Sequence, residues 1–262
     1  MSPSQLDGAQ ADPELNHRLA KHLKGCCMGG SLHAFACCPS TMDIAVDLAR
    51  QGAGEGTLVF AARQELGRGR QGRRWESPEG GAYFSLILKP LRPAAEVPQL
   101  SLVAGLAVAE VIRELTKRSP AIRWPNDVLI DSKKVAGLLV EAREGAVILG
   151  VGINVTADLT QLPDTAMSLA ALGVSADPCE VAAAVCRHID RWYDVWTAKG
   201  FAPIRDALRP CLSHIGGIVR LTTGTEQIEG QAVDLDEHGR LVVRLDSGML
   251  RPFDAGEVTL LR

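Results

Sequence analysis

The sequence predicts an α+β fold, in which helices pack on a mixed β-sheet in a larger domain and a small all-β domain follows. Between residues 31 and 212, short apolar stretches that favour strands alternate with longer stretches of helical period. After about Ser213 the pattern changes to short strands separated by turns. We therefore predict a short N-terminal extension over 1–30, a larger domain over 31–212 and a small β-barrel over 213–262.

The N-terminal extension contains one expected helix, over 12–24, with Asp12 as its N-cap and Pro13 at the first helical position. The larger domain should contain, in chain order, a strand at 32–38, a helix at 40–52, strands at 57–63 and 82–89, a long helix at 98–118, two strands joined by a turn at 121–130, strands at 134–142 and 146–155, and helices at 177–199 and 201–212. This alternation indicates a mixed sheet with its helices on one side.

The C-terminal 50 residues should form a small β-barrel or sandwich. Its expected strands lie at 218–223, 226–236, 240–246, 249–253 and 257–262, with turns such as DEHG and DSG between them. A domain of this size is near the lower limit for independent folding, so we expect it to pack against the larger domain.

The composition excludes several classes of protein. With 46% hydrophobic residues and a formal net charge of -3, the chain has enough apolar surface for a core and no overall basic character that would favour nucleic acid. The first residues lack the apolar segment of a signal peptide, and we expect no membrane span, which indicates a cytoplasmic protein. The seven cysteines show no C-x-x-C spacing, so reduced thiols are expected rather than a zinc site.

The most informative stretch runs from residue 67 to 75 and reads GRGRQGRRW. Its glycines allow the backbone to approach a ligand closely, and its arginines offer planar charged groups for phosphate or carboxylate oxygens. The alternative is a solvated basic loop that binds RNA nonspecifically. Because the stretch occurs once and lies between two expected strands, we interpret it as an anion-binding loop.

Three further stretches carry candidate functional residues. The first is a polar turn, RWPND, at 123–127, where Asn126 and Asp127 could make an Asx-turn or Asp127 could bind Mg²⁺. The second, KVAGLLVE, begins with Lys134, which is either a surface lysine or a point charge for carboxylate and phosphoryl oxygens. The third, GVGINV at 150–155, lacks the third glycine and the following helix of a dinucleotide-binding motif.

In their order and spacing, these four stretches resemble the biotin–protein ligase family, from about Ser40 to the C-terminus. The resemblance implies a biotin-ligase-like sheet domain of the class II synthetase kind with a C-terminal SH3-like barrel. It also implies the type without an N-terminal DNA-binding domain, since only about 39 residues precede Ser40. We expect ATP-dependent formation of biotinyl-5'-AMP, with Mg²⁺, and transfer of biotin to a lysine of a biotin carboxyl carrier protein.

The resemblance also implies roles for individual residues. Biotin should be bound by Ser40, Thr41, Gln64, Arg68, Gly69, Arg70 and Lys134. ATP or the adenylate should be bound by Gly67, Arg73, Trp75, Asn126 and Asn154, with Trp75 covering the adenine. The catalytic residues should be Arg70, Lys134 and Asp127, with Asp127 also facing Mg²⁺. Two positions depart from the family pattern, Met42 in place of a common Asn and Arg123 in place of Lys.

Three other functions are weighed against this one. A lipoate or octanoate ligase or transferase would share the fold, but Gln64 and the arginine loop favour biotin, whose ureido ring can form hydrogen bonds. A transcriptional repressor needs a winged helix, for which the N-terminal extension is too short, so we expect no DNA binding. A general RNA-binding protein is disfavoured by the net charge and the lack of stacking aromatics. The family includes monomers and dimers, so a homodimer is among the expected states.

Overall fold

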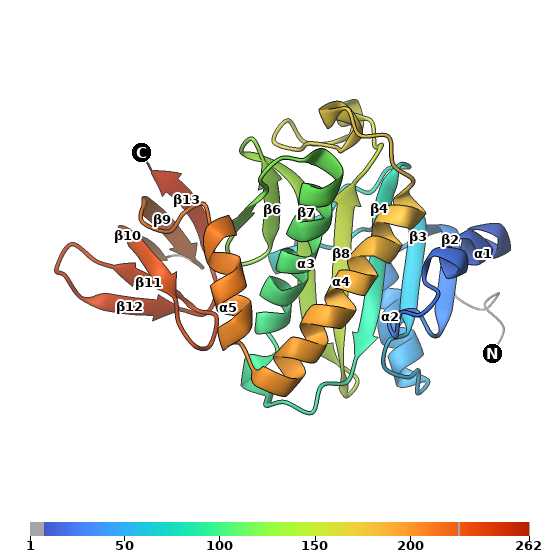
Figure 1. Cartoon of the computed structure of the whole chain (residues 1–262), viewed down its shortest axis with the longest axis horizontal. Helices are drawn as coiled ribbons and strands as arrows, with labels where there is room; N and C mark the ends of the chain where they lie inside the picture. The colour runs from blue at the N-terminus through green and yellow to red at the C-terminus, as the bar shows by residue number, and fades with distance from the viewer. Residues whose placement is uncertain (1–7, 225, 262) are drawn as a thin grey trace.

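The larger part of the chain is built on one mixed eight-stranded sheet (Figure 1). The computed structural model describes residues 8–224 and 226–261. The sheet has the order β1-β2-β3-β4-β8-β7-β6-β5, and only the pair β2 and β3 is parallel. Its strands are β1 (Gln10–Ala11), β2 (Leu32–Cys38), β3 (Leu58–Gln64), β4 (Gly81–Leu88), β5 (Ala121–Arg123), β6 (Asp127–Ile130), β7 (Lys133–Arg143) and β8 (Ala146–Asn154).

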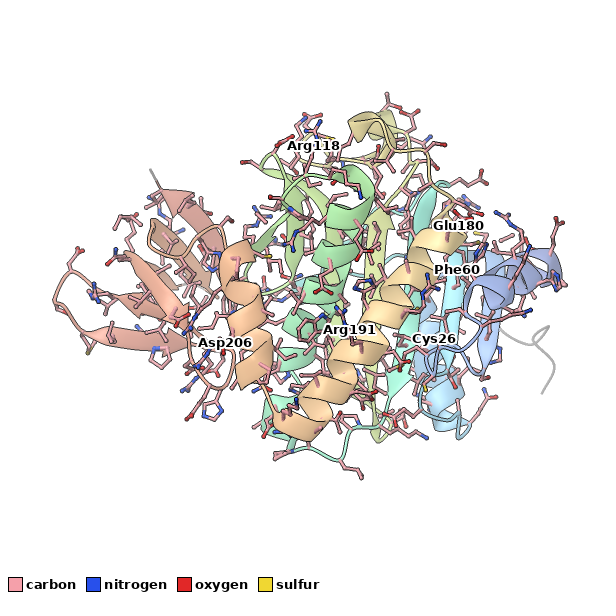
Figure 2. All side chains as sticks on the ribbon, viewed as in Figure 1. Cys26, Phe60, Arg118, Glu180, Arg191 and Asp206 are labelled. Carbon is pink, nitrogen blue, oxygen red and sulfur yellow. The ribbon has the colours of Figure 1, made fainter. Side chains whose placement is uncertain are left out.

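The helices cover both faces of this sheet, which corrects the expectation that they lie on one side. Helices α3 (Gln99–Thr116) and α4 (Pro178–Lys199) pack on the face that carries Phe60 and Phe84, together with the short α5 (Ala202–Leu208). Helix α2 (Thr41–Arg50) packs on the opposite face, against Val59 and Ile148. Figure 2 shows the charged side chains of Glu180 and Arg191 on the outer surface of α4.

Both faces of the sheet need a cover of helices because of the strands at its centre. Alternate side chains of a strand point to opposite faces. All eight residues of β4 and all nine of β8 are buried, so these strands are apolar on both faces and need a cover on each.

The N-terminal segment belongs to the same core. Helix α1 (Pro13–His22) begins as expected, because the Asp12 side chain accepts a hydrogen bond from the Leu15 backbone N–H at 2.9 Å. Leu15 and Leu19 are buried against α4, and β1 pairs with β2. The division at residue 30 stays a prediction, but residues 10–23 pack as part of the larger domain.

The C-terminal segment forms a five-stranded antiparallel sheet of order β12-β11-β10-β9-β13, as the expected small all-β domain. Its strands are β9 (Ile218–Thr223), β10 (Glu226–Leu235), β11 (Leu241–Arg244), β12 (Leu250–Phe253) and β13 (Glu257–Leu261). This sheet contacts the larger domain. The Trp124 indole N–H donates to the Gly239 carbonyl at 3.0 Å, and Arg209 forms an ion pair with Asp234 at 2.7 Å. Buried side chains of both parts form one continuous core.

Helix α3 is the one described helix that is long and apolar enough to cross a membrane by length and composition, counting the short turn before it. Of its most apolar window, 72% is buried inside the fold. Its apolar side chains therefore pack in the core of the larger domain, mainly against α4 and β7.

Candidate active site

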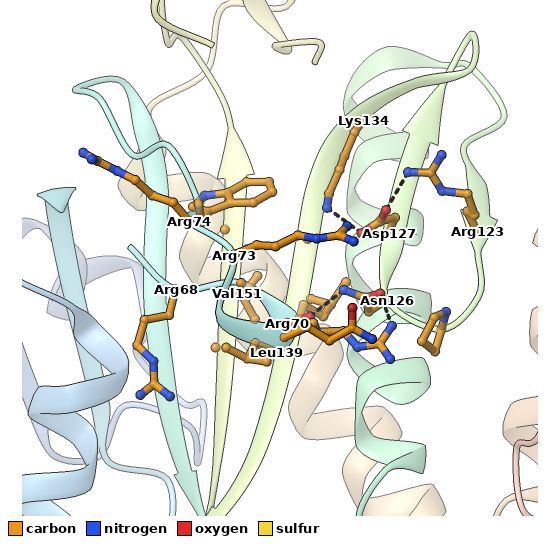
Figure 3. Close-up of a pocket in the computed structure, with 18 of the residues that line it drawn as sticks. Arg68, Arg70, Arg73, Arg74, Arg123, Asn126, Asp127, Lys134, Leu139 and Val151 are labelled. Atoms are coloured by element: carbon orange, nitrogen blue, oxygen red, sulfur yellow. Dashed lines mark hydrogen bonds and ion pairs between the residues drawn. The ribbon is translucent and has the colours of Figure 1, made fainter. Parts of the chain in front are cut away.

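A cavity of about 320 Å³ lies where the arginine-rich loop, strands β6 to β8 and the segment at the start of β13 meet (Figure 3). Ten of the residues proposed from the sequence line it. They are Thr41, Gln64, Arg68, Gly69, Arg70, Arg73, Trp75, Asn126, Asp127 and Lys134. The fold thus brings four separate stretches of the sequence to one place.

The arginine-rich loop is held in a narrow hairpin by its own backbone. The Trp75 N–H donates to the Gly67 carbonyl at 2.9 Å, and the Gly69 N–H donates to the Arg73 carbonyl at 2.8 Å. A Cβ atom on Gly67 would lie 2.4 Å from the Trp75 carbonyl oxygen, so this close approach requires glycine. The loop therefore presents its arginines from a defined backbone.

The arginines of the loop differ in their partners. Arg68 pairs with Asp43 at 2.7 Å and Glu141 at 2.6 Å, and Arg73 pairs with Glu257. Burial opposes the charge of Arg68, but Glu141 and Asp43 outweigh it, so its pKa is raised. These two guanidiniums already have counter-charges.

Arg70 is different, because no carboxylate of the described residues lies within ion-pair distance of it. Its guanidinium donates to the Asn126 side-chain oxygen and to the Gly256 carbonyl, each at 3.2 Å. Burial lowers the pKa of Arg70. A desolvated cation held only by neutral acceptors is suited to bind an anionic ligand.

Asp127 stands at the centre of the charged wall of the cavity. Its carboxylate lies 2.6 Å from the Lys134 ammonium and 2.7 Å from the Arg123 guanidinium, with only 13% of the Asp127 side chain exposed. The two strands that carry Asp127 and Lys134 are neighbours in the sheet. Asp127 therefore orients the lysine that the sequence proposes as catalytic.

Asn126 is fixed across the sheet rather than in its own turn. The side-chain NH₂ of Asn126 donates to the Leu138 backbone carbonyl at 3.0 Å, and the backbone carbonyl of Asn126 accepts from the Leu138 N–H at 2.9 Å. The Asx-turn interpretation of this residue is thereby replaced by a bridge to β7. The remaining side-chain oxygen of Asn126 faces Arg70.

Trp75 lies flat on two glycines. A Cβ atom would approach its ring to 2.9 Å if placed on Gly137 and to 2.5 Å if placed on Gly152. The Lys134 ammonium is 4.9 Å from the ring centre, within range of a cation–π interaction. The glycines of these two motifs therefore make room for an indole ring rather than for a phosphate-binding turn.

Two uncharged polar residues, Thr41 on α2 and Gln64 at the end of β3, also line the cavity. The Thr41 hydroxyl donates to the Gln64 side-chain oxygen at 3.1 Å and lies 2.9 Å from the Ser85 hydroxyl. The Gln64 amide donates to the Ser77 hydroxyl at 2.9 Å. These groups form one connected hydrogen-bonding wall.

Three proposed residues lie outside the lining of this cavity. Gly67 lines an adjoining hollow along the loop. Ser40 is fully buried at the N-cap of α2, with its hydroxyl unpartnered. Asn154 donates to the Met167 carbonyl at 3.1 Å and so anchors the loop that runs beside Lys134, while its side-chain oxygen is buried without a partner.

Sequence reasoning missed the residues that partner the arginines. Asp43 and Glu257 lie outside the four stretches, and Glu141, which closes the stretch KVAGLLVE, carried no sign that it would pair with Arg68. Met42 lines the cavity too, and the sequence singled it out only as a departure from a pattern.

Among residues 8–224 and 226–261, no group of three or more His, Cys, Asp or Glu side chains could hold a metal ion. All seven cysteines are free in the structure, in keeping with the expectation of reduced thiols.

Comparison with known proteins identifies relatives of the chain. Residues 34–158 match the Biotin/lipoate A/B protein ligase family, and residues 214–261 match the Biotin protein ligase C terminal domain. The chain is 37% identical over 227 residues to the bifunctional ligase/repressor BirA of Bacillus subtilis, covering 82% of this chain and 70% of that protein. It is 34% identical over 207 residues to the biotin--[acetyl-CoA-carboxylase] ligase of Paracoccus denitrificans, covering 72% and 85%.

Among solved structures, the biotin protein ligase from Aquifex aeolicus in complex with biotin and ATP superposes with a TM-score of 0.77 at 32% identity. The match covers 89% of this chain and 99% of that one. Fold and site together define a protein ligase of the biotin/lipoate class. Within that class, the similarity over both domains shows that the chain belongs to the biotin protein ligase family.

Proposed function

We propose that this protein activates biotin with ATP to form biotinyl-5'-AMP and then transfers the biotinyl group to a lysine of a biotin carboxyl carrier protein. The observation that carries the proposal is the environment of Arg70, a half-buried guanidinium that donates only to neutral acceptors, in a cavity whose charged wall contains Lys134. The relatives named as biotin ligases support the choice of acyl group.

The activation step needs electrostatic stabilisation more than a covalent nucleophile. A carboxylate is unreactive toward an amine, so its oxygen first attacks the α-phosphorus of ATP and pyrophosphate leaves. Negative charge then accumulates around that phosphorus. Arg70 and Lys134 are placed to neutralise this charge, and each preoriented donor of this kind is worth about 10²- to 10³-fold in rate.

The polar end of the cavity fits a ureido group better than an unsubstituted acyl chain. Thr41 and Gln64 offer donors and acceptors there, and the Ser40 hydroxyl, next to Thr41 in the chain but outside the cavity lining, is buried without a partner. A lipoyl or octanoyl chain has no ureido group that could form hydrogen bonds with Thr41 and Gln64. This arrangement favours biotin over lipoate as the substrate.

At the other end of the cavity we assign the nucleotide. Asn154 lies outside the cavity lining and stays a proposed nucleotide contact, because its side-chain oxygen is buried without a partner and can accept a hydrogen bond. Trp75 offers an aromatic face, and Arg73 and Gly67 remain proposed contacts to the nucleotide. Asn126 then orients Arg70 toward the phosphates.

Binding of Mg²⁺ by Asp127 stays a prediction, and the contacts of its carboxylate fit it poorly. Both carboxylate oxygens of Asp127 already face cations, Lys134 and Arg123, at 2.6 and 2.7 Å. Glu257, the other carboxylate that lines the cavity, is paired with Arg73. These contacts suit a carboxylate that positions Lys134.

In the transfer step the lysine amine of the carrier attacks the acyl carbon and must lose a proton. Asp127 is the proposed acceptor by its place in the cavity. The arginine-rich loop, which covers the cavity, would keep water from the reactive anhydride. We further propose a cytoplasmic enzyme that acts on a carboxylase carrier domain, with a homodimer among its states and without DNA or membrane as a partner.

The proposal is tested by pyrophosphate release with biotin and MgATP, followed by transfer of labelled biotin to an isolated carrier domain. Arg70→Ala and Lys134→Ala should each lower adenylation about 10²- to 10³-fold. Arg50→Ala and Lys133→Ala are the matched controls, since both side chains lie outside the cavity. Pyrophosphate release with lipoate but not with biotin would overturn the assignment of the acyl group.

A further inference from the structure

The two hydrogen-bond acceptors of Arg70 belong to different domains. One is the Asn126 side-chain oxygen, in the turn between β5 and β6 of the larger domain, and the other is the Gly256 carbonyl, directly before β13 of the small domain. Both lie 3.2 Å from the same guanidinium nitrogen, and Figure 3 shows the bond to Asn126. The position of this guanidinium therefore depends on how the small domain sits on the larger one.

A turn of the small domain makes a second contact with the larger domain, outside the cavity. This segment, residues 236–240, joins β10 to β11, and we call it the docking turn. The carbonyl of its Gly239 accepts the Trp124 indole N–H at 3.0 Å. A Cβ atom on Gly239 would lie 3.2 Å from the Leu102 side chain of α3 and 3.3 Å from the Phe201 ring. The docking turn thus fits closely between Trp124, α3 and the start of α5.

The docking turn has a defined conformation of its own. The Asp236 side chain accepts hydrogen bonds from the backbone N–H groups of His238 and Arg240, each at 2.9 Å, and pairs with the Arg240 guanidinium at 2.7 Å. A displacement of the turn is therefore carried into β10 rather than absorbed within the turn. Strand β10 pairs with β9, and β9 pairs with β13, which follows Gly256. The docking turn and the acceptor of Arg70 are thus connected through one sheet.

On the other side of this contact, Trp124 lies two residues before Asn126 in the chain. The Trp124 side chain is buried, with 2% of the residue exposed. The carbonyl of the next residue, Pro125, accepts a hydrogen bond from the Ser101 hydroxyl of α3 at 3.1 Å. The polar turn is therefore fixed from two directions, by α3 and by the docking turn.

We propose that Trp124 and Gly239 are positioning residues for the adenylation step. Their contact sets the placement of the small domain at which Asn126 and Gly256 both accept from Arg70. This inference rests on the proposed function, in which Arg70 neutralises charge that develops at the α-phosphorus. Such a group must be held accurately, because a displacement of about 1 Å can cost about 10²-fold in rate.

The first test compares Gly239→Ala with the matched control Gly248→Ala. Both glycines lie in turns of the small domain at positive φ, 79° and 84°, but a Cβ atom on Gly248 meets open space. Alanine should therefore strain both backbones alike, and only Gly239→Ala should press the docking turn away from α3. The single-turnover rate of pyrophosphate release at saturating biotin and MgATP should fall about tenfold or more in Gly239→Ala and less than about twofold in Gly248→Ala. Equal rates in the two variants would overturn the proposal.

The second test asks whether the contact acts through Arg70, because a general loss of stability could also lower activity. Trp124→Phe keeps a ring but removes the indole donor, and it should lower the adenylation rate about tenfold. In an Arg70→Ala background the same change should lower the rate less than about twofold, since the group that it positions is absent. Trp192→Phe, which removes an indole donor to Glu110 outside the cavity, is the matched control and should have little effect in either background.

The outcomes of this double-mutant cycle separate a positioning role from other roles. A tenfold fall in both backgrounds would overturn the proposal and leave the ligase assignment intact. The biotin concentration at half-maximal rate should change less than about threefold in Trp124→Phe and Gly239→Ala, because the stabilisation arises in the transition state. A rise in that concentration at an unchanged maximal rate would also overturn the proposal.

Two further results complete the test. If Trp124→Phe does not fold, the same cycle is measured with Gly239→Ala and Arg70→Ala, and a fall in rate of equal size in both backgrounds again overturns the proposal. If the natural protein releases no pyrophosphate with biotin and MgATP, the proposed function fails and this inference fails with it.

Discussion

His214 is a buried imidazole in the segment that joins the two domains, and it makes the stability of the protein depend on pH. The residue is 2% exposed, and neither ring nitrogen has a hydrogen-bond partner. Burial, together with the nearby positive charge of Arg123, lowers the pKa of His214 from 6.5 to about 4. The imidazole is therefore neutral in the folded protein throughout the physiological range.

The sign of the effect follows from the two pKa values. Below pH 6.5 the unfolded chain takes up a proton at this imidazole, whereas the folded protein does so only near pH 4. The unfolded state thus binds more protons, and the free energy of unfolding falls as the pH falls through this window. The loss from this residue is about 2 kcal/mol between pH 8 and pH 5, and it reaches about 3 kcal/mol below pH 4.

The assay is urea unfolding at pH 8, 7, 6 and 5 for the natural protein and His214→Phe, which keeps a ring but cannot be protonated. The variant should gain on the natural protein by about 2 kcal/mol as the pH falls from 8 to 5. His238→Phe, which removes an exposed imidazole, is the matched control. A difference between His214→Phe and the natural protein that is the same at every pH would refute the reasoning.

Two further predictions concern the cavity itself. Asp127→Asn removes the counter-charge of Lys134, so adenylation measured by pyrophosphate release should fall about 10²-fold or more. Full transfer of biotin from preformed adenylate in this variant would exclude Asp127 as the proton acceptor. Gly152→Ala places a Cβ atom 2.5 Å from the Trp75 indole nitrogen and should displace the ring. In Gly152→Ala the KM for ATP should rise about tenfold, while the KM for biotin stays unchanged. The control Gly54→Ala should behave like the natural enzyme, because a Cβ atom on Gly54 meets open space. Equal KM values for ATP in the two variants would contradict a role of Trp75 in nucleotide binding.

The order and type of the elements could be predicted from the sequence, because each depends on the periodicity of its own residues. The Asp12 cap, the apolar strand at 32–38 and the short strands after Ser213 are all local patterns, and the structure confirms them. The proximity of Asp127 and Lys134 could be expected from the sequence as well, because their strands follow one another in the chain and pair as neighbours in the sheet.

The partners of these residues were decided by the tertiary structure alone. Arg68 meets Glu141, and Arg73 meets Glu257, across separations of 73 and 184 residues. No local pattern encodes which surface carboxylate will face which arginine, because that depends on strand register and on how the two domains pack. For the same reason the sequence did not predict that α2 covers the opposite face of the sheet from α3 and α4.

The active site shows this division most clearly. By itself the sequence determined which residue types are available for anion binding, since glycine and arginine have those properties wherever they stand. The tertiary structure decided that Arg68 and Arg73 are already neutralised by carboxylates, while Arg70 is half-buried and donates only to neutral acceptors. Charge is a property of a residue, but desolvation and pairing are properties of its surroundings, and these exist only once the chain has folded.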